Sequence, residues 1–137
     1  MDDCIFCKLA NGVFPTATLY EDDDFRVILD LGPASKGHAL VLPKQHYANL
    51  YEIPDELLGK AMAVAKKCGA RLVRAMNADG LNIVQNNGEA AGQTVFHFHI
   101  HLIPRYKGEE MIVAWKPGTL TPEDRDSILA RYAEAEA

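Results

Sequence analysis

Three histidines separated by single apolar residues dominate this sequence: His97, His99 and His101. A two-residue period is typical of a β-strand, so residues 94–103 are predicted to form a strand with all three imidazoles on one face. The apolar residues of the other face are expected to anchor the strand in a core, and they are Phe96, Phe98, Ile100 and Leu102. Burying imidazoles without partners costs free energy, so this pattern indicates a functional site.

The spacing of the three histidines limits what they can do together. Alternate residues of a strand lie about 6.7 Å apart, whereas zinc needs its nitrogens at about 2.0–2.1 Å, so one ion cannot hold all three rings of an unbroken strand. We therefore expect separate roles, with one ring as nucleophile and its neighbours handling protons and phosphate oxygens. Imidazole suits this chemistry because a pKa of about 6.5 leaves it largely neutral at physiological pH.

The rest of the chain is predicted to form short strands and one long amphipathic helix. The predicted strands are 16–21, 25–30, 38–43, 81–85 and 94–103. The predicted helices are 5–10, 55–77 and 121–135. The acidic residues 22–24 are expected in a turn, and residues 105–120 show no clear period. Successive strands with short connections favour an antiparallel sheet with a helix on one face, which is an α+β fold.

Composition and charge narrow the class of protein. A length of 137 residues suits one domain with a sizeable core, and a formal net charge of −5 argues against a nucleic-acid partner. There is no apolar run long enough to span a membrane and no signal-peptide pattern, so we expect no membrane partner and a cytoplasmic location. Three cysteines argue against a disulfide framework, and Cys68 is expected to be a core thiol of the long helix.

The histidine motif and its flanking segments carry a family resemblance. His97-x-His99-x-His101 is followed by Leu102-Ile103 and preceded by Asn86 and by Gly92-Gln93-Thr94-Val95. An upstream segment reads Asp30-x-x-Pro33-x-x-x-Gly37-His38-x-Leu40-Val41-Leu42-Pro43-Lys44-x-His46. Both resemble the HIT (histidine triad) superfamily of nucleotide hydrolases and transferases, in the bacterial branch related to the histidine-triad nucleotide-binding proteins.

This resemblance covers about residues 4–115 and implies a single HIT domain over residues 1–137. The implied fold is a five-stranded antiparallel sheet with one long helix and a short N-terminal helix. Two subunits are expected to form a homodimer in which their sheets become continuous. The remaining tail has the possible helix at 121–135, and the resemblance suggests that the region around Trp115 approaches the partner's active site.

The pair Cys4-x-x-Cys7 has the spacing of half a structural zinc site. Two buried, unmodified thiols are the alternative. The resemblance implies that His46 and His97 complete a structural zinc site, which leaves catalysis to His99 and His101. We expect no catalytic metal and no organic cofactor.

The resemblance also implies roles for residues around the triad. Asn86, Gln93 and Thr94 would contact phosphate oxygens or the leaving group, Asp30 would hold the ribose hydroxyls, and His38 would hydrogen-bond within the triad. The base would lie between apolar side chains, which are Ile5, Phe6, Leu9 and Ile28. Each group has a plainer alternative: an ordinary loop for the amides, core packing for the apolar residues, and a surface position at a strand end for His38.

These features predict an enzyme that cleaves at the α-phosphate of purine nucleoside phosphoramidates. His99 would attack phosphorus and form a nucleotidyl-histidine intermediate, with His101 and Gln93 supplying hydrogen-bond donors. Water would then release the nucleoside monophosphate. A diadenosine polyphosphate hydrolase is one alternative, and a nucleotide-binding regulatory protein with incidental catalysis is another.

Overall fold

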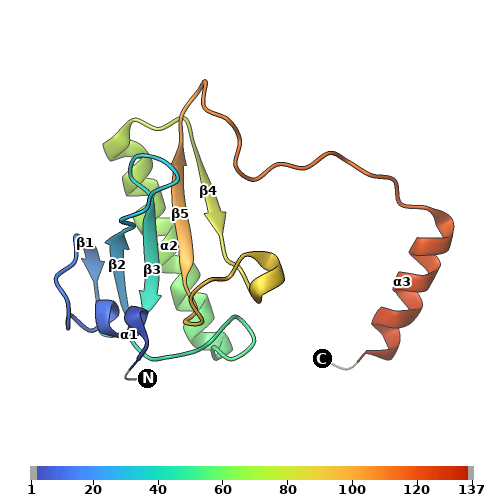
Figure 1. The fold of residues 1–137 in the computed structure, drawn as a ribbon, viewed down its shortest axis with the longest axis horizontal. Helices are drawn as coiled ribbons and strands as arrows, with labels where there is room; N and C mark the ends of the chain where they lie inside the picture. The colour runs from blue at the N-terminus through green and yellow to red at the C-terminus, as the bar shows by residue number, and fades with distance from the viewer. Residues whose placement is uncertain (1–2, 136–137) are drawn as a thin grey trace.

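The computed structural model describes residues 3–135, which include a five-stranded sheet with the strand order β1-β2-β3-β5-β4 (Figure 1). The strands are β1 (Thr18–Glu21), β2 (Phe25–Leu29), β3 (Ala39–Pro43), β4 (Gly80–Val84) and β5 (Ile100–Arg105). The helices are α1 (Ile5–Ala10), α2 (Asp55–Met76) and α3 (Pro122–Glu134), with a 3₁₀ turn η1 (Glu89–Ala91). All neighbouring strands are antiparallel, so the predicted α+β fold is confirmed.

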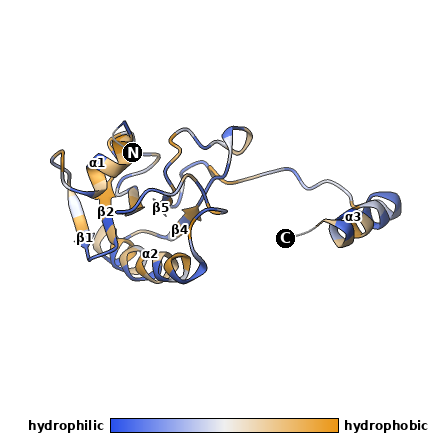
Figure 2. Ribbon diagram, turned by 90° about the horizontal axis from the view of Figure 1, so that it is seen from below, coloured by the Kyte–Doolittle hydropathy of each residue, from blue (hydrophilic) through white to orange (hydrophobic). Residues whose placement is uncertain are grey.

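The sheet is covered on both faces, with α1 on one side and α2 on the other (Figure 2). The core beneath α2 includes Phe25, Val27, Val41, Ile100 and Leu102. The smaller core beneath α1 consists of Ala10, Ile28, Leu40 and Leu42, with Phe6 and Leu9 packed against it. Because helices cover both faces, β3 is buried along its whole length. Any ligand on the α1 face must therefore bind beside this short helix.

Helix α2 forms close to where the apolar period predicted it. The acidic side chains of Asp55 and Glu56 lie in its first turn, where they interact favourably with the positive end of the helix dipole and stabilise the helix. The helix ends at Asn77, whose φ of 50° is the left-handed conformation common at C-caps. Cys68 lies on the buried face and is 7% exposed, as expected for a core thiol.

Strand β5 is shorter than predicted, because it begins at Ile100 rather than at residue 94. Val41 is the last residue of β3 that pairs with β5. Two residues later, Pro43 has no N–H to donate to a strand at this edge. The N–H of Phe98 donates instead to the carbonyl of Tyr47 at 2.6 Å. Phe96 does not anchor the strand as predicted, since it is 50% exposed, whereas the other three apolar residues of the pattern are buried.

After β5 the chain leaves the domain as an extended segment that ends in α3 (Figure 1). Residues 107–135 are all exposed, and the segment between β5 and α3 is irregular, as predicted. The hydroxyl of Thr121 caps α3 by accepting a hydrogen bond from the Asp124 N–H at 3.1 Å. None of the helices within residues 3–135 combines the length and the apolar character needed to cross a membrane.

Candidate active site

Strand register places the last histidine of the motif on the α1 face. His101 pairs with Leu40, which pairs in turn with Ile28, so the three side chains form a row across β5, β3 and β2. They line a pocket of about 490 Å³ under α1. The sheet therefore places the imidazole of His101 beside the apolar side chains of Leu40 and Ile28.

Seven of the residues predicted from the sequence meet in this pocket, and they are Phe6, Leu9, Ile28, Asp30, Thr94, His99 and His101. Six others that the sequence analysis missed complete its lining, namely Pro15, Thr16, Ala17, Leu29, Leu31 and Leu40. Three of these, Pro15, Thr16 and Ala17, lie between α1 and β1, because β1 begins at Thr18 rather than at residue 16 as predicted. Leu40 could have been found, because it lies two residues after His38 on the same predicted strand.

A hydrogen bond to the main chain determines which ring nitrogen of His99 carries the hydrogen. Its Nδ1 lies 2.7 Å from the carbonyl oxygen of His97, and a carbonyl can only accept, so Nδ1 must carry the hydrogen. The lone pair of neutral His99 is therefore on Nε2, in a ring that lines the pocket. Phe6 of α1 packs edge-on against this ring, with the centroids 4.9 Å apart. The ring is thus oriented by one hydrogen bond and one aromatic contact.

A second chain of hydrogen bonds assigns the protons of His38 and His101. Nδ1 of His38 accepts from the N–H of Ala34 at 2.9 Å, so the hydrogen of neutral His38 is on Nε2. That Nε2 lies 2.9 Å from Nδ1 of His101, which must accept. The hydrogen of His101 is therefore on its Nε2. The result is a bare imidazole nitrogen on His99 beside an N–H donor on His101, with ring centroids 4.9 Å apart.

Burial keeps these rings neutral. It lowers the pKa of His101 to about 4, with the neighbouring His99 and His38 acting in the same direction. Burial also lowers the pKa of His99 and of His38, although Asp30 opposes the shift in both. Neutral rings at physiological pH are what the two tautomers require, and neutral His99 is nucleophilic.

Asp30 follows β2, and its two carboxylate oxygens have different neighbours. Its Oδ1 accepts from the N–H of Gly32 at 2.8 Å, and its Oδ2 lies 3.6 Å from Nε2 of His38. Asp30, His38 and His101 also lie close enough together to share a metal ion. The bond from the Ala34 N–H argues against that, because it holds the proton of His38 on the nitrogen that would have to bind the metal.

Two predicted polar residues do not face this pocket. Gln93 is 2% exposed, and its amide hydrogens are donated to the carbonyls of Ala48 at 2.7 Å and Val95 at 3.1 Å. Its oxygen accepts from the Gly88 N–H, so Gln93 shapes the loop and has no hydrogen left for a substrate. Its predicted catalytic role would require one of these hydrogen bonds to be exchanged for a bond to the substrate. Asn86 lies outside the pocket lining as well.

Ile5 also departs from its predicted role as a wall of the base site. It is 43% exposed and does not line the pocket, because the face of α1 that packs on the sheet is the one bearing Phe6 and Leu9. His38 lies behind the pocket and reaches it only through its bond to His101. It is 5% exposed, so it is not a surface residue.

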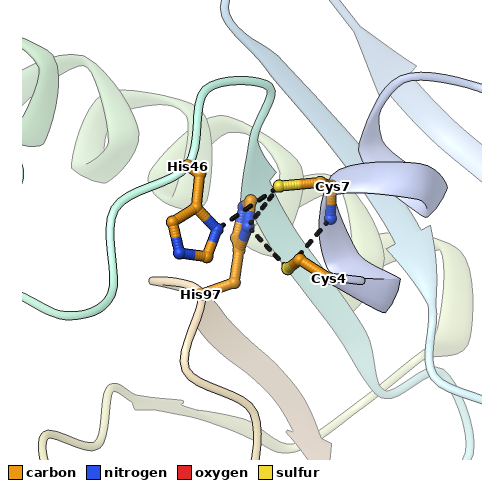
Figure 3. A group of neighbouring side chains, drawn as sticks. All are labelled: Cys4, Cys7, His46 and His97. Carbon is orange, nitrogen blue, oxygen red and sulfur yellow. Dashed lines mark hydrogen bonds between the residues drawn. The ribbon is translucent and has the colours of Figure 1, made fainter. Parts of the chain in front are cut away.

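The two N-terminal cysteines meet two histidines in a separate cluster, formed by Cys4, Cys7, His46 and His97 (Figure 3). Cys7 Sγ lies 3.3 Å from Nδ1 of His46 and 3.4 Å from Nδ1 of His97, and Cys4 Sγ lies 3.4 Å from the same His97 nitrogen. Tetrahedral zinc with ordinary bond lengths separates sulfur from nitrogen by about 3.6 Å. The cluster therefore fits a zinc ion closely.

The surroundings of this cluster prepare His97 to be a ligand. Its Nε2 lies 2.9 Å from the carbonyl oxygen of Pro43 and must donate to it, which leaves Nδ1 bare toward the sulfurs. Burial and the Cys4 thiol raise the pKa of Cys7 to about 11, so a cation bound here would displace a proton. The two thiols and two imidazoles are the donor set typical of structural zinc.

A bare imidazole nitrogen, an adjacent N–H donor and a carboxylate therefore line one pocket that also has apolar walls. The HIT domain family model matches residues 11–108, so the chain belongs to the HIT family. A Bacillus subtilis protein named Protein hit is 41% identical over 97% of this chain and 94% of its own. An adenosine 5'-monophosphoramidase from Saccharomyces cerevisiae is 46% identical over 82% of this chain and 69% of its own.

Solved structures agree with this assignment. The crystal structure of a HIT family member from Bacillus subtilis matches with a TM-score of 0.88 at 41% identity, covering 98% of both chains. A zinc-bound histidine triad family protein from Mycobacterium smegmatis matches with a TM-score of 0.75 at 38% identity, covering 96% of this chain and 93% of that one.

Proposed function

We propose that this protein hydrolyses purine nucleoside phosphoramidates through a covalent intermediate on His99. The observation that carries the proposal is the pair of tautomers in the pocket, with a bare Nε2 on His99 and an N–H donor on His101. Similarity to a yeast adenosine 5'-monophosphoramidase supports the choice of substrate class. The base would lie between α1 and Ile28, with the ribose hydroxyls on Asp30.

In the first step, Nε2 of His99 attacks the α-phosphorus and the bond from phosphorus to the amine breaks. The amine leaves with the bonding electrons and takes up a proton from solvent. The hydrogen on Nδ1 of His99 stays in its bond to the carbonyl of His97, which stabilises the positive charge that the ring acquires. His101 donates to the phosphoryl oxygens as negative charge develops there.

In the second step, water attacks the same phosphorus and gives a proton to solvent. The phosphorus–nitrogen bond to His99 breaks, the lone pair returns to Nε2, and a nucleoside monophosphate is released. The hydroxyl of Thr94 also lines the pocket and is a further donor for the phosphate. The side chains of Cys4, Cys7, His46 and His97 take no part in these steps; only the main-chain carbonyl of His97 does.

A panel of adenylates and guanylates that differ only in leaving group tests this function. Faster turnover of the phosphoramidate than of a diadenosine polyphosphate is the expected result. The reverse order would assign the protein to the diadenosine polyphosphate hydrolases. Tight nucleotide binding with negligible turnover of the whole panel would indicate a regulatory nucleotide-binding protein.

Two structural features complete the proposal. One zinc ion would be held by Cys4, Cys7, His46 and His97 and would tie α1 to the loops before β5 and after β3. The protein would also be a homodimer in the cytoplasm. Exposed apolar side chains on the C-terminal segment support the dimer, since they lack a covering surface in the single chain.

A further inference from the structure

A second cavity, of about 250 Å³, lies between β1 and α2, apart from the histidine pocket. We call it the β1–α2 groove, and its walls include Leu19 and Tyr20 from β1 with Lys67, Arg71 and Leu72 from α2. Within the described residues β1 pairs only with β2, so its outer edge carries unpaired main-chain groups. Proteins commonly protect such an edge by covering it with a helix or a loop.

The rim of this groove is basic in a chain whose net charge is −5. The second half of α2, residues 66–76, contains four basic side chains and no acidic one. These residues are all exposed, and they are Lys66, Lys67, Arg71 and Arg74. The ammonium of Lys67 stands 5.0 Å from the ring centroid of Tyr20 at the wall of the groove. An acidic segment with an apolar face would complement this surface.

Helix α3 has that character. Ile128, Leu129 and Tyr132 are 56%, 63% and 83% exposed, and their spacing places them on one side of the helix. Over Pro122–Glu134 the helix has four acidic and two basic residues. An isolated helix of about 13 residues is only marginally stable in water, so α3 needs a surface to pack against.

We propose that α3 of one chain docks in the β1–α2 groove of a second copy of this protein. The apolar face of α3 covers Leu19 and Leu72, and its acidic residues lie among the basic side chains of α2. In Figures 1 and 2 the two elements are at opposite ends of the molecule, so reciprocal exchange between two copies is the direct arrangement. The inference rests on the homodimer of the proposed function.

Docking also connects α3 to the histidine pocket. Thr16 and Ala17 line that pocket, and the next residues, Thr18 and Leu19, line the groove. A helix packed on β1 therefore stabilises one wall of the partner's substrate pocket. Loss of docking is expected to make residues 16 and 17 more mobile without changing the position of His99.

Amide hydrogen exchange followed by mass spectrometry tests the proposal, with light scattering on the same samples. In the wild-type dimer, amides of α3 are expected to be protected. Removing the chain after Lys107 is expected to raise exchange in β1, and Arg71→Glu is expected to raise exchange in α3, each by about tenfold or more. Lys60→Glu is the matched control, because Lys60 is a basic residue of α2 outside the groove.

Leu129→Asp on α3 provides a second variant that leaves the folded domain untouched, and it should expose β1 as truncation does. Exchange in α3 that is unchanged by Arg71→Glu would overturn the proposal. So would α3 protection that persists in monomers at high dilution, since the helix would then pack on its own chain. Because light scattering reports the dimer separately, a dimer with freely exchanging α3 refutes the docking site alone, whereas a monomer refutes the homodimer.

Discussion

The carbonyl oxygen of His97 accepts a hydrogen bond from Nδ1 of His99 at 2.7 Å, while the imidazole of His97 belongs to the cysteine cluster. One residue therefore links the candidate zinc site to the candidate nucleophile. Its side chain is held by Pro43 and the cysteines, and its main chain sets the tautomer of His99. The two candidate sites are thus joined through a single residue.

His99 is expected to be the residue that becomes covalently modified. His99→Ala should abolish the intermediate but retain nucleotide binding, because the apolar wall and Asp30 lie elsewhere in the pocket. His101→Ala should slow turnover by about 10²–10⁴-fold while still permitting an adduct. Neutral or alkaline denaturation followed by mass spectrometry locates the adduct. An adduct on His97 or His101 would contradict the assigned mechanism.

The cysteine cluster is expected to bind about one zinc ion per chain. Cys4→Ser should lose the metal and lower the thermal unfolding midpoint, and a chelator should lower that of the wild type but not of the variant. Metal analysis and thermal unfolding measure these effects. Cys68→Ala is the control, because this core thiol lies outside the cluster and should leave the zinc content unchanged. Freshly purified, reduced protein without zinc would refute the site.

Light scattering at micromolar concentration is expected to give the mass of a dimer. The exposed residues Met111, Trp115 and Leu120 lie on the segment that leaves the domain, and burying them against a partner would stabilise the assembly. Removing the chain after Lys107 should weaken the dimer and alter the relative turnover of substrates with different leaving groups. A full-length protein that is monomeric under these conditions would contradict this expectation.

Asp22 should make stability depend on pH in the acid range. Burial acts to raise its pKa, but hydrogen bonds from the Tyr20 hydroxyl and from the N–H groups of Asp24 and Phe25 bring it below the ordinary value of 3.8. As the pH falls, Asp22 therefore binds a proton in the unfolded chain before it does so in the folded protein. Its contribution to the free energy of unfolding is fully present above pH 3.8 and is lost as the pH falls through the lower pKa of the folded protein.

Asp22→Ala is accordingly expected to lower the free energy of unfolding by about 1–2 kcal/mol at neutral pH. The difference from the wild type should shrink in urea titrations performed at progressively lower pH below 3.8. Asp23→Ala provides the comparison, because the side chain of Asp23 is exposed and should change stability by less than about 0.5 kcal/mol. An equal effect of both substitutions at every pH would refute the role of Asp22.

Much of the fold was accessible from periodicity. The apolar repeat of α2 and the acidic turn before Phe25 are local patterns, so both were predicted closely. The alternation around His101 predicted a strand there, but the strand begins at Ile100 rather than at residue 94. Local chemistry also identified Cys4 and Cys7 as a candidate half-site for zinc. Only residues that repeat at a regular interval, or that stand at a recognisable spacing, carry this kind of signal.

The tertiary structure decided what each polar group does. The pairing of β3 with β5 ends at Val41 and Ile100, so the residues before Ile100 are not held in the sheet. His97 joins the cysteines there, while His99 lines the pocket. In the folded chain, Gln93 donates its amide hydrogens to the carbonyls of Ala48 and Val95. Sequence alone determined which imidazoles and thiols were present and roughly where. The partners that fix the protons of His97 and His101 are Pro43 and His38, which come from distant segments, so only the packed chain could assign them.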